Sequence, residues 1–560
     1  MSQINAGKGK HPKALYILAM TEMWERFAYY LLAGILLLYL EDTQMGGKGL
    51  ASRTAADITG TFLALIWLPL FVGGMIADRY FGYIKSIFIG GALLAAGYFG
   101  LMLPGTTSMY ISLGLIICGN GFFKPNISTL LGNIYNKEEL KPLKDTAYNI
   151  FYMGINTGAL LCNFAAAYLR NKYHGWAYPF GAAGVGMVIG LIWFGLNLKS
   201  IRQGDVRKPP QKEDMGLGSI AGYVFLPAII AAVIGFYLPG KVFHTTIMGS
   251  PASDAFVFAC VPIIGFFISI WIKANKEDKR GIGALLYIFA VSVIFWALYY
   301  QIFTGYTLWT DRYTNRTVNS PVVRKVADFM GLLQEVNTEP RKVDSVNAQL
   351  MPVYDDSGHV IQTMGPDPYY QNLPKEKWPP AGHGLKIANP ELYASIVPFF
   401  VVTLTPILVA FLAFLRKRKR EPTTPAKFGI ALFLSGISSL VMFFAVLSVS
   451  SIYHDKVSSA WLWGTYCVIC TAEIFLSPMG LSMVSKLAPA RLTSLLMGGW
   501  FLTMSLGSKI AGLMASSWDK FPDKRTYFLV YFVAGIIGSA ILFARIKGLN
   551  AVVKEKTGEA

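Results

Sequence analysis

Charged residues are scarce in this chain of 560 residues: they make up 15% of it, whereas a typical soluble domain carries about 25%. Apolar residues reach 54% and form many runs of the ~20 residues that a helix needs to cross a bilayer. A soluble protein is therefore excluded, and the sequence indicates an all-α polytopic membrane protein. The formal net charge of +18 then points to loops against anionic lipid, and we expect no nucleic-acid partner.

The sequence is also poor in metal-binding, redox and catalytic motifs. The five cysteines all fall in apolar segments, and the Cys467-x-x-Cys470 pair has no second pair or histidines beside it, which favours packing over metal or redox chemistry. None of the six histidines lies near the middle of a predicted span, which argues against a histidine proton relay. The chain has no Gly-x-Ser-x-Gly or His-Glu-x-x-His motif. We therefore expect neither an enzyme nor a bound cofactor.

The apolar runs predict fourteen membrane-spanning helices, arranged as six, an extra pair, and six. They are expected near residues 14–40, 54–77, 83–103, 107–134, 146–169, 176–198, 218–238, 254–274, 282–306, 391–415, 425–450, 459–485, 491–516 and 526–546. This count predicts an N-terminal six-helix bundle at 1–200, a linker with the extra pair at 201–280, and a C-terminal six-helix bundle at 281–560.

The positive charges of the short loops predict the orientation of the chain. They gather in alternate loops, on the side of the N-terminus, and include Lys199, Arg202, Arg207, Lys208, Lys212, Lys273, Lys276, Lys279 and Arg280, and the run Arg416 to Arg420. Because cytoplasmic loops carry the excess of lysine and arginine, both termini are predicted to be cytoplasmic. The N-terminus is short and basic and leads into a full span, so no cleavable signal peptide is predicted.

A long polar insert at 308–388 then lies on the opposite face. Ser320-Pro321 is typical of a helix N-cap with proline at the first helical position, and apolar residues follow it at helical spacing. The stretch 353–361 has the pattern of a hairpin with a polar turn. Both an ordered small cap and a flexible loop are compatible with this insert.

The first predicted span contains three charges within five residues: Glu22, Glu25 and Arg26. With Tyr29 they fall at positions i, i+3, i+4 and i+7, which lie on one face of a helix. Charges in hydrocarbon cost several kcal/mol each unless they are paired or face water, so this stripe must point into a bundle. It indicates a functional site; the alternative is a buried ion pair that only locks helix packing.

Three further polar groups fall at membrane depth: Lys124 beside Pro125, Asn156, and Glu473. Together with the first span they give three acids and two bases. When two ion pairs form, one carboxylate remains and can exchange a proton. A proton-coupled carrier requires such a site, because its charge pairing changes when a proton arrives.

The turn between the second and third spans contains Gly74, Asp78 and Arg79. This Gly-x-x-x-Asp-Arg pattern resembles the loop motif of the major facilitator superfamily, where it brings two helices close together and supplies a cytoplasmic charge lock. We expect Asp78 and Arg79 to act at a gate. The alternative is a tight glycine-rich turn with surface charges.

Taken together, these segments resemble the proton-dependent oligopeptide transporter family (POT or PTR) over nearly the whole chain except the insert. The matching stretches are Glu22-x-x-Glu25-Arg26, Phe122-Phe123-Lys124-Pro125, Phe151-Tyr152-x-x-Ile155-Asn156-x-Gly158, Glu473-x-x-x-Ser477-Pro478-x-Gly480-Leu481-Ser482, Lys486-Leu487-Ala488-Pro489 and Met497-Gly498-Gly499-Trp500-Phe501. The extra pair of spans is similar to that of bacterial members, which implies the inner membrane of a bacterium.

The resemblance implies a major facilitator fold that works by alternating access, driven by a proton gradient. It places Glu22, Glu25, Arg26 and Lys124 in proton coupling. It implies that Glu473 and Asn156 hold the amino terminus of a peptide. The residues that it implies for substrate binding are Tyr29, Tyr30, Lys124, Asn156, Tyr300, Glu473, Ser477 and Trp500. The expected partners are a small peptide, protons and membrane lipid, and the expected state is a monomer.

The chain departs from the family pattern at three positions. Ala33 stands where the family usually has an arginine, Tyr300 where it has an acid, and Val397 where it has an asparagine. The missing arginine and acid tend to pair across the outer gate in the family, and removing both together avoids a stranded charge. We therefore expect the outer gate to close through aromatic packing, aided by the insert, and the peptide carboxylate to rely on Lys124 and tyrosine hydroxyls.

Three functions remain open at this point. The first is a proton-coupled symporter of di- and tripeptides or peptide-like compounds. The second, prompted by the three departures, is the same machine with another small amine-bearing cargo that lacks a free carboxylate. The third is a transport-inactive receptor or scaffold that uses the insert as a binding domain.

Overall fold

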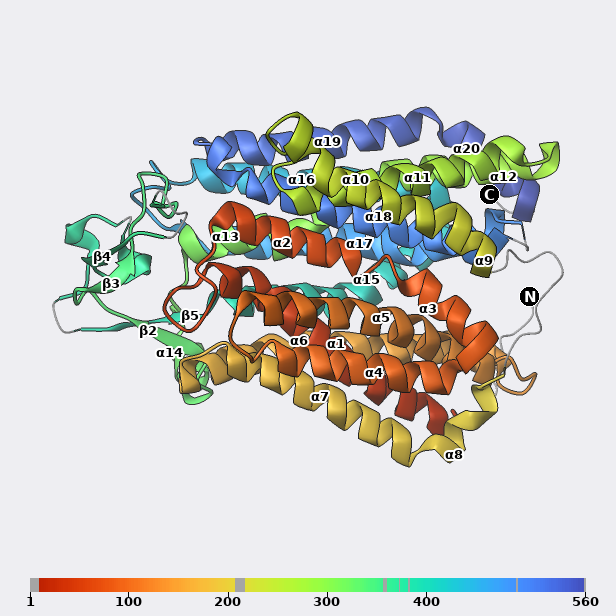
Figure 1. The fold of residues 1–560 in the computed structure, drawn as a ribbon, viewed down its shortest axis with the longest axis horizontal. Helices are drawn as coiled ribbons and strands as arrows, with labels where there is room; N and C mark the ends of the chain where they lie inside the picture. The colour runs from red at the N-terminus through yellow and green to blue at the C-terminus, as the bar shows by residue number, and fades with distance from the viewer. Residues whose placement is uncertain are drawn as a thin grey trace.

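The computed structural model describes residues 10–206, 217–355, 360–371, 373–380, 383–489 and 492–557. Long helices run side by side along the molecule, and a small domain with short strands covers one end of them (Figure 1). We call this end the insert side. The start of α1 and the last helix, α20, lie at the other end, which we call the termini side (Figure 1).

The N-terminal half is a six-helix bundle in which α1 packs against α6 and α7, and α4 packs against α5 and α7. Its second span is broken by Pro69 and ends in a π-helical turn, Ala77–Phe81. The helices are α1 (Lys13–Glu41), α2 (Ser52–Leu65), α3 (Leu70–Ile76), α4 (Tyr83–Gly100), α5 (Thr106–Ile134), α6 (Lys144–Tyr173), α7 (Ala177–Leu196) and the short α8 (Leu198–Ile201).

The C-terminal half repeats this plan, with α16 packed against α17 and α19, and α12 against α18. In the described part of the chain, three α-helices connect the two halves. They are the short α9 (Leu217–Ile220) and the extra pair, α10 (Leu226–Val242) and α11 (Pro251–Lys273). The C-terminal helices are α12 (Lys276–Tyr299), α13 (Gly305–Arg312), α15 (Ile396–Lys417), α16 (Thr424–Leu447), α17 (Ala460–Leu487), α18 (Thr493–Ser516), α19 (Lys524–Ala544) and α20 (Ile546–Thr557).

Thirteen stretches of the described chain are long and apolar enough to cross a membrane. The α18 helix is also long enough, at 24 residues, but Lys509 and several glycines and serines make it less apolar. With α18 the layout is that of fourteen spans, as predicted. The predicted loop charges Arg207, Lys208 and Lys212 lie outside the described residues.

The two halves touch most closely where α2 meets α18. A methyl group added to Gly60 would lie 2.5 Å from the Cα of Gly512, so only hydrogen fits between the two backbones. Small residues let membrane helices approach in this way, because packing and backbone contact replace the hydrophobic effect inside a bilayer. A second contact between the halves joins α6 and α15.

The insert is an ordered cap and not a flexible loop; the sequence alone leaves both arrangements open. Its strands are β1 (Thr314–Asn315), parallel to β6 (Val457–Ser458), and two antiparallel pairs, β2 (Leu333–Val336) with β5 (Leu385–Ala388) and β3 (Arg341–Asp344) with β4 (Gln362–Gly365). Val336, Tyr369, Tyr370 and Ile387 form its small core.

Two local predictions for the insert are confirmed. The helix after Ser320 is α14 (Pro321–Phe329), and the Ser320 side chain accepts a hydrogen bond from the Val323 N–H. The chain also turns back after Tyr354, since this residue bridges to Val360 and the Ile361 N–H donates to the Val353 carbonyl at 2.8 Å. The turn itself, Asp356 to His359, lies outside the described residues.

Candidate functional site

The charged stripe of α1 lies inside the N-terminal bundle. Glu22, Glu25 and Arg26 are each at most 2% exposed. The Arg26 guanidinium binds Glu25 in a two-pronged ion pair, through Nε to Oε2 and through Nη2 to Oε1 at 2.6 Å. A charge pair of this kind is among the stronger polar interactions that a protein can make in a dry environment.

Glu22 is held much less tightly than Glu25. Its Oε1 lies 3.5 Å from the Arg26 Nε, and its Oε2 is buried without a hydrogen-bond partner. Asn120 of α5 completes the cluster: it accepts from the Arg26 Nη2 at 3.3 Å and donates to the Ile66 carbonyl at 2.8 Å. Glu22 is therefore the carboxylate that can change its charge without stranding the guanidinium.

Lys124 of α5 lies near this cluster, within electrostatic range of Glu22 and Glu25. Its ammonium stands over the ring of Trp67, 4.2 Å from the ring centroid. A cation over an aromatic face is attracted by the electron-rich ring, so Trp67 compensates part of the cost of placing this charge at membrane depth. The structure thus brings the four residues predicted for proton coupling together in one region.

Glu473 of α17 lies apart from these charges, in the other half. One of its oxygens, Oε2, is buried without a hydrogen-bond partner. The carboxylate is surrounded by tyrosines from both halves: Tyr299 is within hydrogen-bonding reach, and the carboxylate also interacts electrostatically with Tyr30 and Tyr152. A group that bears a positive charge and several N–H donors is the natural partner of such a carboxylate.

The remaining residues predicted for substrate binding differ in accessibility. Tyr30 and Ser477 are half-buried. Asn156 is 6% exposed and donates to the carbonyl of Tyr152 in its own helix, at 2.9 Å. Tyr29 and Tyr300 are buried, at 3% and 2% exposed.

Trp500, which the resemblance implies for substrate binding, is as buried as Tyr29 and Tyr300 in this conformation. It is 3% exposed, and its ring packs against Phe289, Trp296 and Phe428 and onto the backbone of Gly480. The physical reason is the glycine, which leaves room for the indole between α17 and α18. Trp500 therefore supports the position of α17 in this conformation.

The predicted gate turn is closed by local hydrogen bonds. The Asp78 carboxylate accepts from the hydroxyl of Tyr83 at 2.6 Å. Asp205, beyond α8, accepts from the first free N–H of α4, that of Tyr83, at 2.7 Å. Arg79 follows Asp78 in the same π-helical turn and is half-buried. The turn thus holds α3, α4 and the end of the N-terminal bundle together on the termini side.

Ion pairs join the two halves on the insert side, where we expected aromatic packing. Arg312, at the end of α13, binds both oxygens of Glu41 at the end of α1 at 3.0 Å and donates to the Ser52 hydroxyl at 2.7 Å. The Arg170 Nε of α6 lies 3.0 Å from Oε1 of Glu391, and both side chains are at most 7% exposed. We did not predict these ion pairs; closure through aromatic packing around Ala33 and Tyr300 stays a prediction.

A third ion pair lies deeper, between α2 and α18. The Lys509 Nζ lies 2.7 Å from Asp57 Oδ1 and 2.6 Å from the Thr61 hydroxyl. Asp57 also accepts from the hydroxyls of Ser250 and Ser253, which begin α11 of the extra pair. One carboxylate thus connects the N-terminal half, the C-terminal half and the extra helices.

Our sequence inventory of charges at membrane depth missed Asp57 and Lys509. Both residues were available as signals, because they lie within the predicted spans 54–77 and 491–516. The pairing was not, since the two residues are 452 positions apart. Aromatic contacts between the halves do accompany the ion pairs: Trp67 stacks on Phe501 with ring centroids 6.2 Å apart, and Tyr30 lies 6.4 Å from Phe303.

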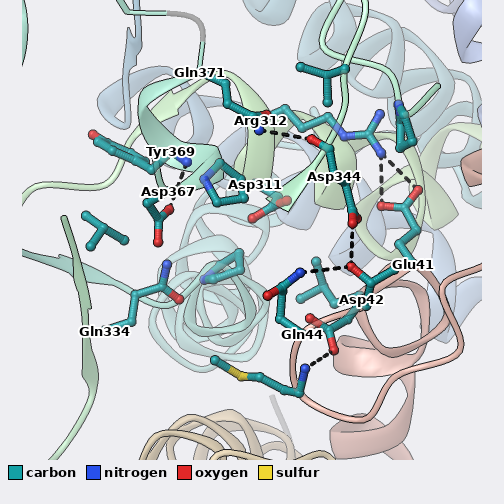
Figure 2. A pocket seen from close by; sticks show the side chains of 18 of the residues that line it. Glu41, Asp42, Gln44, Asp311, Arg312, Gln334, Asp344, Asp367, Tyr369 and Gln371 are labelled. Carbon is teal, nitrogen blue, oxygen red and sulfur yellow. Dashed lines mark hydrogen bonds and ion pairs between the residues drawn. The ribbon is translucent and has the colours of Figure 1, made fainter. Parts of the chain in front are cut away.

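A cavity of about 250 Å³ lies between the insert and the bundle end. Figure 2 shows its polar lining, in which Arg312 is bound to Glu41 and the Asp344 carboxylate points toward the residues that follow α1. Gln371 donates to the Asp344 carbonyl, and Asp367 accepts from the Tyr369 N–H on the other side of the cavity. Asp344 accepts from the Thr43 hydroxyl at 2.6 Å. The cap is thus fastened to the mouth of the bundle by polar contacts around this cavity.

Two charged groups beside this cap have perturbed pKa values. Burial raises the pKa of Asp367, although the Tyr369 N–H and Arg341 oppose this effect. Burial and the nearby Arg316 guanidinium lower the pKa of Lys456 to about 7. Lys456 donates to the Arg312 carbonyl at 2.7 Å and stands over the Tyr369 ring, so it connects the C-terminal bundle to the cap.

Comparisons with known proteins agree with this architecture. The sequence profile of the POT family matches residues 84–334 and 384–531. An uncharacterized transporter of Bacillus subtilis, YclF, is 31% identical over 97% of this chain and 94% of its own. A di-/tripeptide transporter of Lactococcus lactis is 28% identical over 95% of this chain and 94% of its own.

Solved structures show the same fold. A crystal structure of a mutant peptide transporter of the POT type, in complex with alafosfalin, superimposes with a TM-score of 0.73 at 26% sequence identity. The match covers 98% of this chain and 96% of the other. The fourteen-helix major facilitator layout of the described residues is therefore consistent with this match.

The Lys509–Asp57 pair can be tested by stability. Replacing Lys509 by methionine leaves the buried Asp57 without its cation, and removing one partner of a buried pair costs about 3–5 kcal/mol. We expect a clear fall in the apparent melting temperature of the purified protein in detergent. The double variant D57N/K509M is expected to recover part of the loss, since no charge is left unpaired.

The matched control is Lys520→Met, which removes an exposed lysine shortly after the end of α18 and should change stability by no more than about 0.5 kcal/mol. If K509M and K520M melt at the same temperature, Lys509 does not hold the halves together.

Proposed function

Because the chain belongs to the POT family, we propose that it is a proton-coupled symporter that imports di- and tripeptides or peptide-like compounds by alternating access. The observation that carries this proposal is the division of charge between the halves. Glu473 offers an unpartnered carboxylate oxygen in one half, and Glu22 offers another in the other half.

We propose that Glu473 receives the amino terminus of the substrate. A carboxylate with one unpartnered oxygen at membrane depth is costly, and a substrate ammonium would supply both the opposite charge and the missing N–H donors. Tyr30, Tyr152 and Tyr299 around it offer hydroxyls and flat apolar faces. Such walls tolerate many side chains, as a transporter of mixed peptides requires.

We propose that Glu22 takes up the coupling proton. Glu25 already neutralises Arg26 through two contacts, whereas Glu22 makes one long contact. Protonation of Glu22 would therefore leave the Arg26–Glu25 pair intact and would change the balance of charge that Lys124 experiences. The proton would thus alter the surroundings of the substrate carboxylate without unfolding the site.

The positive charges of the loops on the termini side support an orientation with both termini in the cytoplasm and the insert outside. The ion pairs on the insert side would then close the external entrance in this conformation. We propose that the protein works as a monomer in the cell membrane, since each chain contains both halves of the transport path.

A second cargo class has support at the carboxylate end of the site. Ala33 and Val397 are buried and apolar, at 1% and 7% exposed, where the family pattern places polar groups. Lys124 is then the main cation available for a substrate carboxylate. A small amine-bearing compound without a free carboxylate would bind Glu473 through its ammonium group. It would not need the arginine that the family has at the position of Ala33.

Uptake into proteoliposomes under an inward proton gradient tests these proposals. Accumulation of dipeptides that a protonophore abolishes supports the peptide symporter. Gradient-driven flux of amines but not of peptides supports the second cargo class. Absence of flux for a broad panel of both would contradict transport and favour the receptor role considered from the sequence.

The first variant to test is Glu473→Gln. Loss of a charge-assisted hydrogen bond of about 1.5–3 kcal/mol predicts a fall in affinity for peptides with a free amino terminus on the order of 10- to 100-fold. N-acetylated analogues should lose much less. The control is Ser485→Ala, an exposed position near the end of α17, and an equal loss for both classes of ligand would contradict the role of Glu473.

The second variant is Glu22→Gln, which mimics a permanently protonated side chain. We expect it to exchange peptide between preloaded compartments while losing accumulation driven by the proton gradient. Exchange and net uptake are measured on the same proteoliposomes, so that binding and coupling are separated. Glu25→Gln is the contrasting variant: it strands the buried Arg26 and should reduce the yield of folded protein. Persistent gradient-driven uptake by E22Q would place the coupling proton elsewhere.

A further inference from the structure

The helix α14 carries an apolar face that nothing in the described chain covers. Around its axis the apolar side chains occupy one side, and the polar ones, Arg324, Lys325 and Asp328, occupy the other. The apolar side chains are widely exposed: Val322 71%, Val323 56%, Val326 52%, Phe329 93% and Met330 46%. Single exposed apolar residues are common, but a contiguous face of four on one short helix, extended by Met330 directly after it, indicates an interaction surface.

The end of α14 is fixed to the bundle. Gly331 has a φ of +66°, and the Leu332 N–H donates to the Ala327 carbonyl at 2.9 Å, which closes the helix as a Schellman motif. Asn171 of α6 then donates to the carbonyls of Gly331 and Leu333, at 3.0 and 3.2 Å. Since α6 ends at Tyr173, the C-terminal end of α14 is held at the level where this candidate membrane-spanning helix ends.

The rotation of α14 about its axis is also fixed. Lys386 of β5 binds Asp328 through both carboxylate oxygens, at 2.6 and 2.8 Å. This contact turns the polar side of α14 toward the sheet of β2 and β5. The side with Val326 and Phe329 must then face away from the insert.

The exposed face lies next to exposed tyrosines at the ends of α6 and α7. Tyr168 lies next to Gly331, and Tyr173 stacks on Tyr178 with ring centroids 4.4 Å apart. These three tyrosines at the ends of α6 and α7 are 38% to 46% exposed, and tyrosine is enriched where membrane proteins cross the headgroup layer. Figure 1 places α14 beside this end of α7, on the outer flank of the bundle.

We propose that α14 is an interfacial membrane helix: it lies in the headgroup layer on the insert side, with Val322, Val326 and Phe329 on the acyl chains and Lys325 toward the lipid phosphates. Its occupant is lipid, because the apolar face lies next to the exposed tyrosines at the ends of α6 and α7 and basic residues border it. The helix thereby anchors the cap to the membrane as well as to the bundle mouth.

Site-directed fluorescence on the full-length protein in proteoliposomes tests this proposal. The accessible Cys118 and Cys467 are replaced by alanine, and single cysteines are introduced as F329C, K325C and M364C. Each is labelled with an environment-sensitive fluorophore. Lys325 is the matched control on the polar side of α14, and Met364 of β4, 69% exposed, lies in the part of the cap that projects away from the bundle (Figure 1).

The vesicles contain phosphatidylethanolamine and phosphatidylglycerol, with or without phosphatidylcholine that carries a nitroxide near its headgroup. At position 329 we expect blue-shifted emission, strong nitroxide quenching, and iodide quenching several-fold weaker than at 325. At position 364 we expect emission typical of water and no nitroxide quenching.

Equal iodide quenching at 329 and 325, without nitroxide quenching at either, would overturn the proposal. So would a blue shift at 329 that grows with protein density but is insensitive to the nitroxide lipid, since that result indicates a second copy of the chain. A label at position 329 can perturb the helix, so Val326→Lys is a second test. It should weaken nitroxide quenching of a label at position 322, whereas Arg324→Ala on the polar side should not.

Discussion

A guanidinium buried at membrane depth is the constraint on which the N-terminal half depends. Arg26 is 2% exposed, and an uncompensated charge there costs several kcal/mol. The chain places two carboxylates and an amide around it, all from α1 and the facing α5. Glu25 makes two close contacts with Arg26, whereas Glu22 makes one long contact. This difference is the reason why we propose Glu22, and not Glu25, as the group that takes up the coupling proton.

The second set of charges has a different role because its pairs join the two halves. Arg312–Glu41, Arg170–Glu391 and Lys509–Asp57 all connect an N-terminal with a C-terminal element. Opening of the insert side would separate these partners and expose them to water, where each charge is solvated. The attraction within such a pair is strong when water is excluded and weak when water surrounds the charges. These pairs therefore suit a contact between the halves that would form and break during transport.

The three departures from the family pattern fit this arrangement. Ala33, Tyr300 and Val397 are buried apolar or aromatic side chains, so the region where the family keeps a charged pair is packed as a core. The charged closure lies instead nearer the membrane surface and at the α2–α18 contact. The cap adds further polar contacts around the same mouth, through Thr43 and Asp344. The ion pairs that join the halves therefore lie at positions that no local motif connects.

The sequence by itself determined the class of protein, the number of spans, the buried stripe of α1 and the helix after Ser320. Each of these depends on residues close together in the chain: apolar length decides whether a helix crosses a bilayer, and spacing of three and four decides which charges share a face. The tertiary structure alone decided which distant charges pair, as with Asp57 and Lys509, whether Trp500 is accessible, and where α14 lies. Those outcomes follow from how whole helices pack, and packing joins residues hundreds of positions apart whose partners no local pattern records.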